Sequence, residues 1–575
     1  MKRAGKIGVL LCFLFLAGVL TATAAPPDRD HDGFSRRVDC NDRDPRIFPG
    51  APEICGDNID QNCDGVPDDG CTITPPPTEP TDPTEPPAPT EPPTPTDPTG
   101  STPPPTTGHA GLTYSGPDLC LSCHQVEAAE MFNSLHYQWQ GDTPYMTFGP
   151  EKQGKIAGAV NSYCGNISGN WGGCSACHTG RGLVPETVQS PEQLANIDCL
   201  LCHQKEYRRV KVNGVMVPDT ANMSISMDEA VQTVHLPQRE NCLNCHAKAG
   251  GGDALKRGDL ALASANTTDR TYDVHMATSG ANLSCQSCHQ VENHRIAGRG
   301  SDLRATDLDV PVSCSNCHRS TPHSNSTLNR HTAKIACQTC HIPVYGKNAA
   351  DTASTEATET ERHWQQGTEH AAPPFHPVVV KANNLKPVYR FWNGLSENYM
   401  LGEITGIDPA TGAYPTSRPA GTINDGKLYP FKYKISDYPM RTASQELIPL
   451  DTSVFFASAD ADAAARAGLI NMGYSAADAY EWVTTDTFQA LNHQVSPKSQ
   501  ALNCTNCHLK TTQLDLQGEL GYAPKKPQST CSLACHSSSK AAEWRYGDWE
   551  EYQAHHNKHV NEKGATCADC HNFSR

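Results

Sequence analysis

A short run of apolar residues opens the chain, where IGVLLCFLFLAGVL follows Lys2, Arg3 and Lys6. The small residues Ala22-Thr23-Ala24 come after the run and are typical of a signal-peptidase site. The run is shorter than the ~20 residues that a membrane span requires. We therefore expect a cleaved signal peptide over 1–24, an exported protein and no membrane span after cleavage. The alternative is an uncleaved membrane anchor.

Beyond this run the hydrophobic pattern is weakly periodic. Residues 75–107 are rich in proline and threonine, which excludes helix and sheet, so we expect 73–110 to be an extended linker. The alanine-rich stretch from Ala457 to Leu491 predicts two or three helices. Elsewhere from 111 to the end, few segments have a long period. The pattern therefore predicts mainly short α-helices and loops, with little β-structure.

The cysteines change this picture. The pattern Cys-x-x-Cys-His occurs nine times, and we number the first eight copies as motifs 1–8. It is the attachment signature of a c-type haem, in which two thiols bind the vinyl groups and the histidine ligates the iron. One copy could equally be a zinc site or a redox disulfide, but nine copies leave little room for those interpretations. The cysteines are Cys120, Cys123, Cys174, Cys177, Cys199, Cys202, Cys242, Cys245, Cys285, Cys288, Cys314, Cys317, Cys337, Cys340, Cys504, Cys507, Cys567 and Cys570. The proximal histidines are His124, His178, His203, His246, His289, His318, His341, His508 and His571.

A tenth site is expected at TCSLACHS, where three residues rather than two separate the cysteines. In a chain that already carries nine signatures, Cys531, Cys535 and His536 are most simply another haem site. A structural disulfide is the alternative. The predicted cofactor content is thus about ten covalent haems, and Cys164 is left over.

The opposite face of each iron needs a sixth ligand. With His31 and His109 set aside for their positions in the acidic region and beside the linker, thirteen histidines remain for this role. They are His136, His235, His275, His294, His323, His331, His363, His370, His376, His493, His555, His556 and His559. Met131, Met146 and Met276 are alternatives at some sites. Two histidine ligands leave no open position, which favours electron transfer over substrate chemistry. We also expect the closely spaced haems to replace an ordinary side-chain core.

Residues 26–72 form an acidic region with few apolar residues. Aspartates alternate ahead of Gly33 and again, with an asparagine, ahead of Gly65, as in loops that bind calcium through oxygens. The candidate ligands are Asp28, Asp30, Asp32, Asp39, Asp60, Asn62 and Asp64. Two disulfides among Cys40, Cys55, Cys63 and Cys71 are expected, with the pairing open. The region resembles a metal-binding repeat of secreted bacterial proteins and, more loosely, the aspartate-rich repeats of thrombospondin. An acidic spacer is the alternative.

The formal net charge of −17 argues against nucleic acid as a partner, because phosphates require a basic surface. An acidic, solvated surface is the simplest interpretation of this charge.

Residues from about 114 to 508 resemble the octahaem tetrathionate reductase family of c-type cytochromes. The resemblance is carried by strings such as CLSCHQVEAAEMFNSLHYQW, VNSYCGNISGNWGGCSACH, NCLNCHAKAGGGDALKRGDL and LNHQVSPKSQALNCTNCH, which are far longer than the haem signature. It implies an octahaem domain over 111–510 and an added segment, 511–575, with two more haems. His556 and His559 are placed to serve these added haems. The resemblance also implies that the sixth ligands include His136, His275, His294, His323, His331 and His493.

In that family the second haem is the active site and has a lysine as its sixth ligand. This implies His178 as the proximal ligand and Lys155 as the catalytic lysine, with Lys152 as second choice and a solvated surface lysine as the alternative. The match is imperfect here, because the family has adjacent lysines where this chain has Lys155-Ile156. The family also has histidines near where Arg257 and Lys434 stand, so some ligands are expected to differ.

Three functions follow from these expectations. The first is an exported cytochrome, extracellular, at the cell surface or periplasmic, that carries electrons along its haems to a redox protein or an extracellular acceptor. The second is a respiratory reductase of tetrathionate or a nitrogen oxyanion at the second haem. The third is a homo-oligomer or filament joined through its terminal haems. The added haems and the linker favour the first.

Overall fold

The computed structural model describes residues 108–163, 165, 170–175, 177–300, 305–352, 357–371 and 373–503, with short stretches and single positions within 34–66 and 506–572. The chain divides into two units, Met1–Pro92 and Pro93–Arg575, which are described separately. The boundaries predicted at 72, 110 and 510 lie in or beside ranges outside the described residues and remain predictions.

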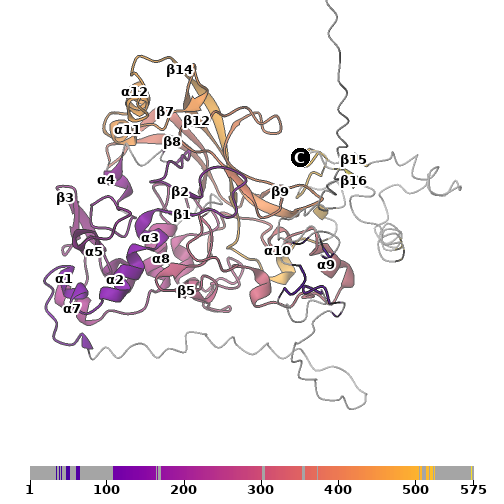
Figure 1. Ribbon diagram of the computed structural model, residues 1–575, viewed down its shortest axis with the longest axis horizontal. Helices are drawn as coiled ribbons and strands as arrows, with labels where there is room; N and C mark the ends of the chain where they lie inside the picture. The colour runs from indigo at the N-terminus through magenta and orange to yellow at the C-terminus, as the bar shows by residue number, and fades with distance from the viewer. Residues whose placement is uncertain are drawn as a thin grey trace, which may run out of the picture. The chain divides into compact units, whose positions relative to one another are not determined.

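The amino-terminal part of the second unit consists mainly of short helices joined by loops (Figure 1). Most have one or two turns, and five of the α-helices and two 3₁₀ segments coincide with cysteine motifs. The α-helices are α1 (Asp118–Leu121), α2 (Gln125–Phe132), α3 (Leu135–Gln138), α4 (Trp171–Cys174), α5 (Pro191–Ala195), α6 (Leu200–His203), α7 (Met227–Gln232), α8 (Arg239–His246), α9 (Ser326–His331) and α10 (Cys337–His341). The 3₁₀ segments are η3 (Leu262–Ala265), η4 (Cys285–Ser287), η5 (Cys314–Asn316) and η6 (Lys498–Gln500).

Small two-stranded sheets connect these helices. The antiparallel pairs are β1 (Gln140–Asp142) with β2 (Lys152–Gly154), β3 (Arg209–Val212) with β4 (Val215–Pro218), and β5 (Val291–Glu292) with β6 (Arg295–Ile296). Near the carboxyl terminus β15 (Ala523–Pro524) pairs with β16 (His571–Asn572). The first three of these pairs therefore lie in segments that connect successive cysteine motifs.

An eight-stranded mixed sheet lies between motifs 7 and 8 in the sequence. Its path is β10-β11-β14-β12-β7-β8, with β9 and β13 also paired to β12. The central strand β12 is antiparallel to β14 and parallel to β7, so it joins segments far apart in the chain. The strands are β7 (Thr358–Glu369), β8 (Phe375–Ala382), β9 (Val388–Trp392), β10 (Ser396–Asn398), β11 (Tyr414–Pro419), β12 (Lys427–Arg441), β13 (Glu446–Leu447) and β14 (Tyr480–Ala490).

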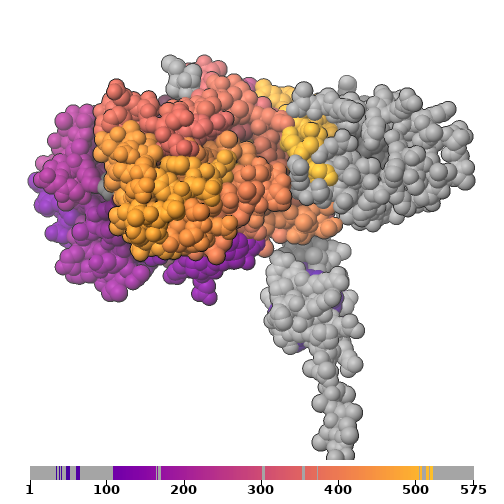
Figure 2. All heavy atoms as spheres, turned by 90° about the horizontal axis from the view of Figure 1, so that it is seen from above, coloured from indigo at the N-terminus to yellow at the C-terminus, as the bar shows by residue number. Residues whose placement is uncertain are grey.

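Two helices, α11 (Thr452–Ser458) and α12 (Ala461–Asn471), pack beside β7 and β8 (Figure 1). Asp451 and Asp460 cap them by accepting hydrogen bonds from backbone amides in their first turns. Their apolar side chains meet the sheet in a core that includes Trp364, Tyr438 and Phe455, all fully buried. The sheet and its helices (orange) lie beside the motif-bearing segments (indigo to magenta) in Figure 2.

This sheet makes the predicted fold class wrong. Mainly helical structure with little β was expected, but the longest elements are strands, and the sheet has an ordinary core of aromatic and aliphatic side chains. The prediction of helices across 457–491 is also wrong in its second half. There the alanine-rich part ends with α12, and Tyr480–Ala490, rich in aromatic and β-branched residues, forms β14.

Among the described residues, no helix combines the length and the apolar character needed to cross a membrane.

Candidate haem-ligation sites

The cysteine motifs that the structure describes fold as single tight turns. In motifs 1, 3, 5 and 6 the histidine amide donates to the carbonyl of the first cysteine, with N to O distances of 2.8–3.1 Å. In motifs 4 and 7 the motif lies within α8 and α10. One helical turn places both sulfurs and the imidazole on neighbouring positions, which is the arrangement that two thioether bonds and one axial ligand require. None of the fourteen cysteines of motifs 1–7 takes part in a disulfide.

Six of the proximal histidines face a second histidine across a gap. The ring centroids are 5.9–6.3 Å apart in every pair, although some partners are near in the sequence and others come from distant parts of the chain. The pairs are His124–His109, His203–His294, His246–His136, His289–His493, His318–His275 and His341–His323.

The repeated separation fits a haem iron between the two rings. An imidazole nitrogen binds a metal at about 2 Å, so two imidazoles on opposite faces of one iron have centroids roughly 6 Å apart. Direct stacking of two rings would bring them closer, as in His370 and His376, whose centroids are 4.0 Å apart. The residues at these six motifs therefore fit a haem with two histidine ligands.

Hydrogen bonds to the outer ring nitrogen support this assignment. In five of these histidines Nδ1 lies 2.9–3.3 Å from an oxygen that can only accept, so Nδ1 carries the proton and the Nε2 lone pair is left for a metal. The contacts are His203 with the His235 carbonyl, His289 with the Ala297 carbonyl, His294 with Glu130, His323 with Asn329 and His493 with Asp259.

Burial also keeps these imidazoles neutral. Burial, reinforced by His136 and Arg257, lowers the pKa of His246 to about 3. Burial, with His493 nearby, lowers the pKa of His289 to about 4. A neutral imidazole is the form that ligates a metal, so the protein environment holds both rings ready for ligation at neutral pH.

Contacts between thiols show which motifs are neighbours. The side chains of Cys120 and Cys199, Cys177 and Cys245, Cys242 and Cys285, and Cys314 and Cys337 are close neighbours. Cys202 also lies near Cys242, and Cys288 near Cys317. The motifs therefore adjoin one another in the order 1–3–4–5–6–7, and motif 2 branches from motif 4.

Motif 2 is built differently. The His178 ring is fully buried between Tyr137, Trp139 and Trp171, with centroid distances of 5.0–5.4 Å. Its Nε2 donates to the Tyr137 carbonyl, and its Nδ1 accepts from the Gly180 amide at 2.9 Å. This tautomer is the reverse of that of the proximal histidines His203 and His289, and in the described part of the chain no histidine ring faces His178. In this arrangement the His178 Nε2 is not available to bind an iron. To ligate one, His178 would have to break its hydrogen bond with the Tyr137 carbonyl.

Positive charges surround motif 2. Lys155, Arg209 and Lys248 all act electrostatically on Cys177. The Lys155 ammonium lies 5.6 Å from the centroid of Trp139, the same ring that contacts His178. Lys152, the second choice, is exposed on β2. The structure therefore brings Lys155 to the neighbourhood of motif 2, and its role as a ligand remains a prediction.

Arg209 holds the backbone of motif 2. Its guanidinium donates to the carbonyls of Ser175, His178 and Gly180 and to Asp198 Oδ2, which lies 3.1 Å from Nη1. Both charged side chains are almost completely buried, at 4% and 2% exposure. One residue thus fixes the turn that presents His178.

Replacing Arg209 with methionine is expected to lower the free energy of unfolding by about 3–5 kcal/mol, because it leaves Asp198 buried without this partner. The check is the shift of the thermal unfolding midpoint, followed by far-ultraviolet circular dichroism. The control is Arg466→Met, which breaks an exposed ion pair with Asp462 and is expected to cost under about 1 kcal/mol. Equal shifts for the two variants would contradict the inferred role of Arg209.

The remaining predicted ligands are placed as follows. His235 faces none of the described proximal histidines: its Nε2 accepts from the Lys205 amide, and its Nδ1 donates to the Leu236 carbonyl. His331 lies on α9 with Nδ1 donating to the Thr327 carbonyl, and its role as a sixth ligand remains a prediction. His109 was not among the candidate sixth ligands predicted from the sequence, yet it faces His124. Its signal was its place just ahead of motif 1, on the cytochrome side of the linker.

Other predicted site residues lie outside the described residues, or have no described side chain, and remain predictions. They are Asp28, Asp30, Asp32, Asp39, Cys55, Cys71, Cys164, Cys504, His508, Cys531, Cys535, His536, His556, His559, Cys567, Cys570 and His571.

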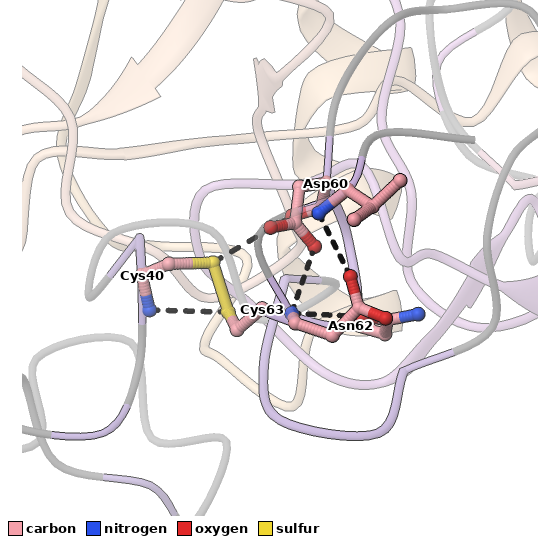
Figure 3. The surroundings of a disulfide bond; sticks show 6 residues. Cys40, Asp60, Asn62 and Cys63 are labelled. Carbon is pink, nitrogen blue, oxygen red and sulfur yellow. Dashed lines mark hydrogen bonds between the residues drawn. A yellow bond between two sulfur atoms is a disulfide. The ribbon is translucent and has the colours of Figure 1, made fainter. Parts of the chain in front are cut away.

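In the amino-terminal unit, a disulfide joins Cys40 to Cys63, which settles one pairing left open by the sequence. Beside it, Asp60 Oδ1 and Asn62 Oδ1 accept hydrogen bonds from the Asp64 amide at 3.2 and 2.9 Å (Figure 3). Asp64 in turn accepts from the Val66 amide at 2.8 Å. The loop thus gathers three oxygen-bearing side chains, and calcium as its ligand remains a prediction.

Comparison with known proteins agrees with this geometry. A family model described as "Cytochrome c bacterial" matches residues 353–511, which hold the large sheet and motif 8. A model described as "Putative metal-binding motif" matches residues 39–69. The crystal structure of an octahaem cytochrome c from Shewanella oneidensis is similar, with 29% identity and a TM-score of 0.60, over 72% of this chain and 95% of that chain.

An uncharacterised protein of Archaeoglobus fulgidus is 32% identical over 245 residues, covering 33% of this chain and 79% of that protein. The nine attachment signatures, the facing histidines and the likeness to the Shewanella structure all indicate the same cofactor. The chain is therefore a multihaem c-type cytochrome, and it belongs to one family with the Archaeoglobus fulgidus protein.

Proposed function

We propose that this protein is an exported cytochrome that carries single electrons along about ten covalent haems to a redox protein or an extracellular acceptor. The observation that carries the proposal is the set of six facing histidine pairs. Haem supplies reversible one-electron chemistry, and two histidine ligands close both faces of the iron to substrates. The continuous order of neighbouring motifs supports transfer along the chain rather than isolated cofactors.

The test is the mass and the redox behaviour of the exported protein. We expect the exported protein to have lost residues 1–24 and to have gained the mass of about ten haems. Its oxidised haems are expected to give low-spin electron paramagnetic resonance signals that disappear stepwise as the haems are reduced in a redox titration. A mass equal to the bare chain, with no Soret absorbance, would overturn the proposal. A mass showing nine haems and a Cys531–Cys535 disulfide would correct the haem count.

A reductase of tetrathionate or a nitrogen oxyanion is the second candidate. It is favoured by the positive charges at motif 2, which suit an anionic substrate, and by the lack of a histidine facing His178 in the described residues. Reduced protein would be assayed with tetrathionate, nitrite and hydroxylamine. A reductase is expected to lose its activity in Lys155→Ala but not in the matched variant Lys152→Ala, whose lysine is exposed. Equal activity in all three proteins would argue against a catalytic lysine.

A further inference from the structure

The first motif has a sixth ligand of an unusual kind. His109 faces His124 with centroids 5.9 Å apart and ring planes 12° from parallel. It lies on a turn in which the Leu112 amide donates to the His109 carbonyl at 3.2 Å. Sequence considerations had assigned this residue no role, and no helix or strand carries it.

His109 lacks the support that other facing histidines have. Within the described chain, neither of its ring nitrogens makes a hydrogen bond, whereas His294, His323 and His493 each donate from Nδ1 to a side-chain oxygen. Such partners orient a ligand and raise its basicity, and their loss typically costs about 10–100-fold in metal affinity. Two other facing histidines also lack a described hydrogen bond at Nδ1. In His136 the nitrogen is sealed from solvent, and in His275 the carboxylate of Asp273 lies 3.9 Å away.

The first motif is also open to solvent. Gly108 and Ala110 on either side of His109 are exposed, and the side chains of His124 and Glu127 are 50% and 51% exposed. The carboxylate of Glu127 lies 3.7 Å from His124 Nδ1, whereas no described carboxylate forms an ion pair with His109. The described polypeptide thus leaves His109 partly exposed, as a displaceable ligand would have to be.

We propose that His109 is a displaceable sixth ligand, so that motif 1 is an exchangeable binding site for small iron ligands such as cyanide, carbon monoxide or a free imidazole. The inference rests on the proposed function, because it requires haem at motif 1. With haem bound at motif 1, the incoming ligand would replace the His109 nitrogen, with no change in the oxidation state of the iron. Motif 1 lies at one end of the motif order, so such exchange alters the terminal member of the chain.

The experiment uses cyanide and the full-length oxidised holoprotein, with electron paramagnetic resonance as the readout. We expect cyanide to convert one low-spin signal of the wild type into a histidine–cyanide signal. In His109→Ala the same signal is expected at roughly 10-fold or more lower cyanide, because no ligand has to be displaced. In Glu130→Gln, which weakens the support of His294, a second site is expected to bind cyanide at about 10–100-fold lower concentration than in the wild type.

Controls separate the outcomes. If the cyanide signal of the wild type persists unchanged in His109→Ala, the adduct forms elsewhere, such as at motif 2, and the inference is wrong. If His109→Ala binds cyanide but the wild type binds none at any concentration that leaves the protein folded, His109 is a firm ligand and the inference is again wrong. Both results leave the proposed function intact, whereas a protein without haem by intact mass would overturn the proposed function itself.

Discussion

Replacing Glu359 with alanine is expected to lower the free energy of unfolding of the cytochrome unit by about 3–5 kcal/mol. Glu359 is fully buried and accepts two hydrogen bonds from Arg362, at 2.9 and 2.6 Å, while Lys434 lies 3.2 Å away. Lys434 is also fully buried. Removing the one carboxylate leaves two cations in the interior without their counter-charge, and an uncompensated buried charge is among the costliest defects in a protein.

The same interaction predicts a dependence on pH. Burial acts to raise the pKa of Glu359, but Arg362 and Lys434 outweigh it, so the pKa lies below its usual range. A carboxylate whose pKa is lower in the folded state than in the unfolded state stabilises the folded protein. This stabilisation is complete above the pKa of the unfolded state, about 4.3 for glutamate, and is lost as the pH falls through the pKa of the folded state. The difference in stability between wild type and Glu359→Ala is therefore expected to be constant near neutral pH and to shrink in acid.

Denaturant unfolding followed by far-ultraviolet circular dichroism measures both effects. The control is Glu397→Ala, which removes a carboxylate 2.6 Å from Arg418 at a site where both side chains are about one-third exposed. That pair is expected to contribute under about 1 kcal/mol, and less at high salt. A loss in Glu359→Ala no larger than in Glu397→Ala would show that the buried charges do not stabilise the sheet.

Replacing His493 with alanine is expected to convert one haem per chain from low spin to high spin. His493 faces His289 of motif 5, with centroids 6.2 Å apart, and its Nδ1 lies 3.2 Å from the buried Asp259. Without this ring the motif has no described replacement ligand, so the iron loses its sixth ligand. The change is read from the high-spin signal in electron paramagnetic resonance and from the visible spectrum.

A graded variant and a matched control accompany this substitution. Asp259→Asn keeps the imidazole but removes the negative charge beside Nδ1, and is expected to weaken ligation by about 10–100-fold without abolishing it. His235→Ala removes a histidine whose ring nitrogens are both hydrogen-bonded to the backbone. It is expected to leave every spin state unchanged. A high-spin haem in His235→Ala would show that His235 is a haem ligand in the wild type and would contradict the histidine pairing.

The local chemistry of the sites could be predicted from the sequence because it is contained in five consecutive residues. The turn that brings two cysteines and a histidine together needs no distant partner, and the multihaem cytochrome class follows from its repetition. The partner rings depend on long-range packing. His109 and His235 show this clearly. His109 closely precedes motif 1 and His235 closely precedes motif 4, yet of the two only His109 faces a described proximal histidine.

The large sheet escaped prediction for a physical reason. Its central strand, KLYPFKYKISDYPMR, contains two prolines and two lysines that are fully buried, Lys432 and Lys434. Proline is rare in central strands, and lysine is rarely buried without partners. Here the Lys432 ammonium donates to two backbone carbonyls and a threonine hydroxyl, and Lys434 lies beside Glu359. These compensations come from other segments, so no local pattern reveals the strand.

The position of β12 also has a consequence for biogenesis. Its partners β7 and β14 are far from it in the chain, so the sheet has a high contact order and is expected to assemble slowly. The turns of motifs 1–7 are local and precede the sheet in the sequence, so they form on a faster timescale as the chain emerges. Covalent maturation of those seven sites can therefore run ahead of sheet assembly, whereas motif 8, which follows β14, becomes available only after all the strands have been delivered.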